Sequence, residues 1–134
     1  IFVFILTLFV GFRPEISPLL LLAPFYMLLF AILFTALGTA IASRLNDMQA
    51  FPLVMNFLIM PMFFLSGALF PIDQLPAALK FVVQVNPVSY GVDGMRILLI
   101  NLGHFSLLLD VAVLTVVASL CIAVGAVLFK RIEA

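Results

Sequence analysis

The chain has 134 residues, of which 66% are hydrophobic and only 9% charged, and its formal net charge is +0. Because a soluble domain carries roughly 25% charged residues, this composition excludes a fully water-facing surface and predicts a membrane protein. Six basic and six acidic residues leave no excess of positive charge to bind phosphates, which excludes a nucleic-acid partner. A single cysteine, Cys121, excludes a disulfide framework.

Taken in chain order, the apolar runs predict three full transmembrane helices and the end of a fourth. Residues 1–12 are too short to span, so we interpret them as the end of a helix that the charges and prolines of residues 13–18 terminate. We therefore predict an all-α, polytopic transmembrane bundle, with residues 1–134 forming the C-terminal part of one transmembrane domain. Three uncharged stretches approach or exceed the roughly 20 residues that a membrane requires, namely residues 19–43, 51–70 and 111–129.

The positions of the basic residues predict the orientation. Cytoplasmic loops are enriched in Lys and Arg, which places Arg44 and the basic pair at residues 130–131 inside. The stretch between the second and third full spans must then begin and end outside. It contains two apolar pieces, each too short to span, separated by the Asn-Pro of residues 86–87. We predict an outer re-entrant helical hairpin over about residues 73–103.

Small residues recur at four-residue spacing inside two of the predicted spans. Positions i and i+4 share a helix face, and small side chains allow helix backbones to approach closely. We expect these stripes to pack against other helices within one subunit, in preference to a dimer interface. They comprise Ala31, Thr35, Thr39 and Ser43 in the first full span and Thr115, Ser119 and Ala123 in the last.

Asn56 is a strongly polar residue at predicted membrane depth. Since a buried amide without a partner costs about 1–3 kcal/mol, we expect Asn56 to bind another helix or water. A structural hydrogen bond is the favoured interpretation, and a contact with a transported substrate is the alternative.

The sequence lacks the residues that catalysis or nucleotide binding requires. His104 is the single histidine and lies apart in sequence from Cys121, which argues against a metal site and against a nucleophile paired with a base. No glycine-rich stretch ends in Lys-Ser or Lys-Thr, which excludes a phosphate-binding loop. We therefore expect no catalytic residue, cofactor or metal ligand in this chain, with ATP bound by a partner subunit if ATP drives the protein.

Asp93 and Arg96 lie three residues apart, so they can pair on one helix face. The pair would either steady an interfacial helix, which is the favoured interpretation, or take part in an outer gate. Asp47, Asp73 and Asp110 also fall at predicted loops or hairpin ends, which argues against a proton relay in the middle of the membrane.

Three segments carry a family resemblance through their order. Residues 64–71 read FLSGALFP, residues 75–76 are Leu-Pro, and residues 86–96 read NPVSYGVDGMR. In this order they resemble the C-terminal half of type-2 ABC exporter permeases, especially the drug-resistance and nodulation types. The resemblance covers roughly residues 38–131.

The resemblance implies roles for two sets of residues. The hairpin turn and the start of its return helix, which would form an outer gate, comprise Asn86, Pro87, Tyr90, Asp93 and Arg96. The helix of residues 51–70 would wall a translocation path, whose candidate residues are Asn56, Met60, Phe63, Ser66 and Gly67.

The resemblance also implies partners and a location. It implies two permease subunits, identical or different, docked on cytoplasmic ABC ATPase subunits and surrounded by lipid in the plasma (inner) membrane, with a cytoplasmic C-terminus. The function expected is a non-enzymatic permease subunit of an ATP-driven exporter that moves drugs, lipids or glycans out of the cytoplasm, as in multidrug efflux. A secondary transporter or channel that uses no nucleotide is the alternative.

Overall fold

The computed structural model describes residues 5–6, 9–11, 18–45, 47, 49–70 and 72–130. Every regular element of this part is helical, which confirms the predicted all-α class. The elements are the short 3-10 helix η1 (Pro18–Leu22), α2 (Ala23–Ala42), α3 (Ala50–Phe64), the 3-10 turn η2 (Ile72–Gln74), α4 (Ala77–Val85), α5 (Pro87–Ile100) and α6 (Leu107–Lys130).

Two of these helical segments are long and apolar enough to cross a membrane. One is Pro18–Ala42, which joins η1 to α2 over 25 residues, and the other is Leu107–Leu128 within α6, with 22 residues. They agree with the spans predicted at residues 19–43 and 111–129.

The start of α6 lies earlier than predicted, at Leu107. The hydroxyl oxygen of Ser106 accepts a hydrogen bond from the Leu109 amide at 3.4 Å, so Ser106 caps the helix. Asp110 therefore lies in the first turn of α6 instead of in the preceding loop, which corrects its predicted position.

The end of α3 also differs from the prediction, because this helix stops at Phe64. The Ser66 hydroxyl donates to the Phe63 carbonyl at 2.6 Å, and Gly67 adopts φ +79°, a left-handed conformation that terminates helices. With 15 residues, α3 reaches about 22 Å, which is less than the roughly 30 Å of membrane hydrocarbon. The helix is thus shorter than the span predicted at residues 51–70.

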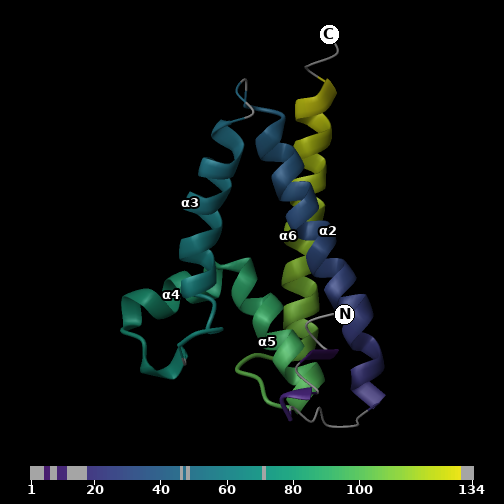
Figure 1. Cartoon of the computed structure of the whole chain (residues 1–134), viewed down its shortest axis with the longest axis vertical. Helices are drawn as coiled ribbons and strands as arrows, with labels where there is room; N and C mark the ends of the chain where they lie inside the picture. The colour runs from purple at the N-terminus through teal and green to yellow at the C-terminus, as the bar shows by residue number, and fades with distance from the viewer. Residues whose placement is uncertain are drawn as a thin grey trace.

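Figure 1 shows that α2 and α6 pack side by side and run in the same direction, whereas α3 runs in the opposite direction. The C-terminal ends of α2 and α6 and the N-terminal end of α3 lie at one end of the molecule, and α4 and α5 lie at the other (Figure 1). The connection that contains Arg44 and the end of α6 are therefore on the same side, as the predicted topology requires.

The core forms where α5 packs against α2 and α6. Two glycines of α5 allow this close approach: a Cβ atom would overlap the Tyr26 ring at Gly94 and the Phe30 ring at Gly91. The Tyr26 hydroxyl donates to the Tyr90 carbonyl at 2.5 Å, which adds a polar link between α2 and α5. The buried residues of this core are Ala23, Tyr26, Leu33, Tyr90, Leu98, Leu114 and Ala118.

The small-residue stripes do not form this core, and their packing against other helices stays a prediction. All of their members except Ser43 are exposed in the described structure. The hydroxyls of Thr39, Thr115 and Ser119 donate to the carbonyl four residues earlier in their own helices. These bonds satisfy the hydroxyl groups within their own helices.

Replacing Gly94 by Ala is expected to destabilise the fold by about 1–3 kcal/mol, because the added methyl group overlaps the buried, hydrogen-bonded Tyr26 side chain. Thermal unfolding of the full-length protein in detergent should show a lower Tm. Gly125→Ala is the matched control, since its added methyl meets the Ala40 Cβ at an ordinary 3.9 Å. Equal Tm values for the two variants would contradict the close approach of α5 to α2.

Candidate functional site

Side chains of α5, and of the residue before it, hold the C-terminal end of α3. A helix leaves its last four carbonyl groups without partners inside the helix. Three carbonyls at or just beyond the end of α3 accept hydrogen bonds from this neighbouring segment. The pairs are Asn86 Nδ2 to the Met62 carbonyl (2.6 Å), Ser89 Oγ to the Leu65 carbonyl (3.4 Å) and Arg96 Nη2 to the Gly67 carbonyl (2.9 Å).

Asn86 has a second role at the start of α5. Its Oδ1 accepts the amide hydrogen of Val88 at 3.0 Å, which is an N-cap, and Pro87 occupies a first-turn position where a missing N–H costs nothing. The side chain of Asn86 is buried. The predicted turn residues Asn86 and Pro87 therefore begin a helix and at the same time attach that helix to α3.

Tyr90 joins three parts of the end of the molecule where α4 and α5 lie, here called the hairpin end. Its hydroxyl donates to the Gln84 carbonyl in α4 at 2.5 Å, and its ring stacks on Phe105 with the centroids 5.0 Å apart. Its own carbonyl accepts the Tyr26 hydroxyl. The side chain thus fixes α4 and the α5–α6 loop relative to α5.

Asp93 is 2% exposed, and its carboxylate holds the loop between α5 and α6. It accepts the His104 amide at 2.8 and 3.0 Å through its two oxygens and the Phe105 amide at 2.7 Å. Arg96 instead donates to the Gly67 carbonyl. The expected pairing of Asp93 with Arg96 is therefore corrected, because each side chain binds a different backbone segment.

A second buried carboxylate lies at the same end of the molecule. Asp110 is fully buried, and neither of its oxygens has a hydrogen-bond partner in the described structure. It continues the buried face of α6 that Leu114 and Ala118 form at four-residue spacing. Burial raises the pKa of the Tyr90 hydroxyl, and Asp110 raises that pKa further.

The candidate path residues separate into two groups. Asn56, Met60 and Phe63 are exposed on one face of α3, at the i, i+4 and i+7 spacing of a helix face. Ser66 and Gly67 are buried in the turn that follows. Asn56 is exposed in the described structure, and its hydrogen bond to another helix or to water stays a prediction.

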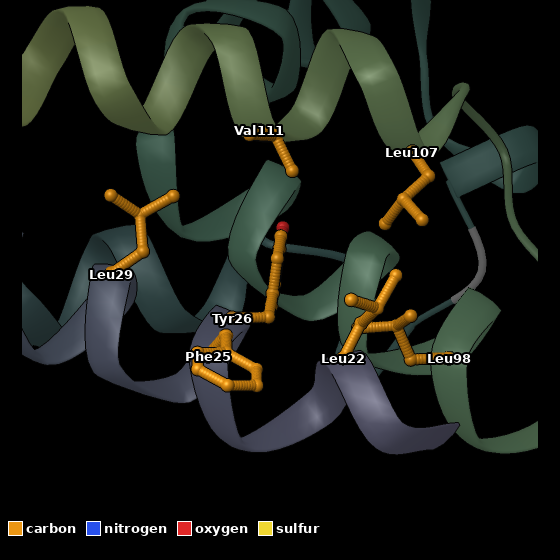
Figure 2. Close-up of a pocket in the computed structure, with 7 residues that line it drawn as sticks. All are labelled: Leu22, Phe25, Tyr26, Leu29, Leu98, Leu107 and Val111. Carbon is orange, nitrogen blue, oxygen red and sulfur yellow. The ribbon is translucent and has the colours of Figure 1, made fainter. Parts of the chain in front are cut away.

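An apolar pocket of about 230 Å³ lies between α2, α5 and α6 near the hairpin end (Figure 2). The one titratable side chain among its lining residues is Tyr26, whose hydroxyl points across the gap and donates to the Tyr90 carbonyl. No group of three His, Cys, Asp or Glu among the described residues could hold a metal ion. The pocket is lined by Leu22, Phe25, Tyr26, Leu29, Leu98, Leu107 and Val111.

The polar groups of this arrangement connect helices to one another. Asn86 and Arg96 connect α5 to the end of α3, and Asp93 connects α5 to the loop before α6. A displacement of α3 would therefore be transmitted through α5 to α6.

Asn86→Asp is expected to weaken the attachment of α5 to α3 while keeping the cap of α5. The carboxylate still accepts the Val88 amide, but it cannot donate to the Met62 carbonyl. Spin labels on α3 and α5 in the full-length protein should show a broader distance distribution. Gln84→Glu makes the same amide-to-acid change at an exposed side chain and should leave the distribution unchanged.

Asp93→Asn is expected to release the α5–α6 loop. The Asn side chain would place its own N–H donors against the backbone N–H groups that donate to the Asp93 carboxylate. Losing such a buried charged acceptor costs about 1–3 kcal/mol. Hydrogen exchange at the amides of His104 and Phe105 should accelerate. The control is Asp47→Asn, because the Asp47 carboxylate is exposed and accepts a hydrogen bond from one backbone N–H group. Unchanged exchange in Asp93→Asn would mean that other contacts hold the loop.

Comparison with known proteins identifies relatives for most of the chain. A family model described as ABC-2 type transporter matches residues 1–100. Nodulation protein J of Rhizobium leguminosarum bv. viciae is 29% identical over 98 residues, which cover 73% of this chain and 38% of that protein. The putative transport permease ycf38 of Porphyra purpurea is 33% identical over 104 residues, which cover 75% of this chain and 35% of that protein.

A second nodulation protein J, from Rhizobium meliloti (strain 1021), is 33% identical over 63 residues, which are 47% of this chain and 24% of that protein. The matched region is thus well under half the length of each of these relatives. No solved structure matches the chain at a significant level. Because the family model covers three quarters of the chain, the chain belongs to the ABC-2 type transporter family, a family of membrane transport permeases.

Proposed function

We propose that the chain is part of the permease subunit of an ATP-driven exporter that moves drugs, lipids or glycans out of the cytoplasm. The observation that carries this proposal is the match of residues 1–100 to the ABC-2 type transporter family. The two helical segments that are long and apolar enough to cross a membrane support the same reading. The relatives named as transport permease and nodulation protein J are consistent with it.

The geometry supports different roles for α3 and for the hairpin of α4 and α5. The exposed face of α3 that carries Asn56, Met60 and Phe63 would wall the translocation path, facing a second permease subunit. Asn86 and Arg96 bind the end of α3, so the hairpin would follow α3 when that helix moves. The hairpin would thereby act as the outer gate.

The energy would come from a partner. ATP would be hydrolysed on a separate cytoplasmic ABC ATPase subunit, a partner that membership in the ABC-2 type transporter family supports. The positive-inside rule supports a cytoplasmic side at Arg44 and at the C-terminal end of α6, in the plasma (inner) membrane. The hairpin would then lie in the outer leaflet.

The proposal predicts ATP-dependent transport by the full-length permease together with its ATPase in proteoliposomes. Candidate drugs, lipids and glycans should be tested for stimulation of ATP hydrolysis and for transport, with a hydrolysis-deficient ATPase as the control. Arg96→Gln should lower transport more than basal ATP hydrolysis, because it loosens the gate from α3 while leaving the ATPase intact. No stimulation by any candidate, with transport intact under an ion gradient, would refute the exporter.

Asp110 favours the alternative, an ion-coupled transporter. A buried carboxylate without a hydrogen-bond partner inside a span is typical of ion pathways. The permease alone, given a proton or sodium gradient and no ATPase, distinguishes the two functions. Gradient-driven transport that Asp110→Asn abolishes would establish the alternative, and ATP-dependent transport that survives this substitution would exclude it.

A further inference from the structure

The short helix α4 exposes apolar surface that the rest of the described chain leaves uncovered. Of its nine residues, Val83 alone is buried. Phe81 and Val85 are each 67% exposed, and Val82 is 42% exposed. Figure 1 shows α4 lying across the end of α3, on the side away from α2 and α6.

The side chains of α4 are sorted by chemistry around the helix. Lys80 and Gln84, four residues apart, form a polar side, and Phe81 and Val85, also four apart, form an exposed apolar side. Val83 is turned toward the protein. A helix with separate polar and apolar exposed sides is suited to the boundary between lipid headgroups and acyl chains.

The depth of α4 follows from the length of α3. The end of α3 is attached to the α4–α5 junction through Asn86, which binds the Met62 carbonyl. If α3 begins at one hydrocarbon boundary, its length of about 22 Å leaves its end about 8 Å short of the other boundary. Interfacial helices bury their apolar faces about 5–10 Å into this boundary, so the depth of the junction fits a helix of this kind.

An apolar hollow extends the exposed side of α4 toward α3. It has a volume of about 250 Å³, and its walls include Val82 and Val85 from α4 and Met62 and Leu65 from the end of α3. The apolar surface is therefore continuous from one helix to the other, which suits flexible acyl chains.

We propose that α4 is an interfacial membrane helix and that membrane lipid is the partner of its exposed surface. Phe81 and Val85 contact acyl chains in the leaflet at the hairpin end of the molecule, and the Lys80 ammonium reaches a lipid phosphate. The long, apolar stem of a lysine allows this reach from within the boundary region. This inference concerns lipid contact, so it holds whether transport is driven by ATP or by an ion gradient.

Site-directed spin labelling of the full-length permease in phospholipid nanodiscs tests the proposal. Single cysteines replace Phe81, Val85 and Gln84 in a cysteine-free background, and relaxation by oxygen and by a water-soluble nickel chelate measures contact with lipid and with water. Labels at Phe81 and Val85 should show severalfold higher oxygen than nickel accessibility. The label at Gln84, on the polar side, should show the reverse.

Three results would overturn the proposal. High nickel accessibility at Phe81 and Val85 would place this side in water. Low accessibility to both reagents, with spin–spin coupling between subunits, would show that a second copy covers α4. Low accessibility to both without such coupling would show that another protein segment covers it.

Lys80 is tested separately in nanodiscs of phosphatidylcholine with and without phosphatidylglycerol. The label at Gln84 reports the depth of the helix, and added anionic lipid should shift that depth in the protein with Lys80 and in Lys80→Arg. In Lys80→Gln the shift should be lost. An identical shift in all three proteins would overturn the assignment of Lys80 to a lipid phosphate.

Discussion

The carbonyl groups at the end of α3 impose the constraint on which the hairpin end depends. A helix that stops within the thickness of a membrane cannot leave its last carbonyls to water, because each unsatisfied group would cost several kcal/mol in hydrocarbon. Here the Met62 carbonyl in the last turn of α3, and the Leu65 and Gly67 carbonyls just beyond the helix, accept hydrogen bonds from polar side chains of the following helical segment. The polar sequence at the start of α5 therefore supplies the hydrogen-bond donors that the end of the short helix α3 requires.

Helix α5 also supplies a hydrogen-bond acceptor to the loop before α6. There the backbone presents amide groups, and the buried carboxylate of Asp93 accepts two of them, from His104 and Phe105. Donors of α5 thus hold α3, and an acceptor of α5 holds the loop to α6. Because Gly91 and Gly94 also bring α5 against α2, this helix directly connects α2, α3 and the loop before α6. A permease that moves its helices against one another would transmit the motion through α5.

The exposed surfaces of α3 and α4 differ in the chemistry of their side chains. One face of α3 presents Asn56, Met60 and Phe63, a mixture of polar and adaptable apolar groups that suits a transport path. The apolar side of α4 carries Phe81 and Val85 beside a lysine, which suits lipid. Asp110, buried without a hydrogen-bond partner, adds a titratable group that neither role accounts for.

Composition and the lengths of apolar runs were sufficient to predict a helical membrane protein, two of its long segments and a pair of short helices meeting at Asn86, because these features depend on local hydrophobicity and on proline and asparagine chemistry. The partners of Asp93 and Arg96, the burial of Asp110 and the exposure of Asn56 were decided by the tertiary structure. Spacing along a helix shows which side chains share a face, but it does not show which backbone groups another helix leaves unsatisfied nearby. Those unsatisfied carbonyls and amides, brought together by packing, selected the partners of the polar residues.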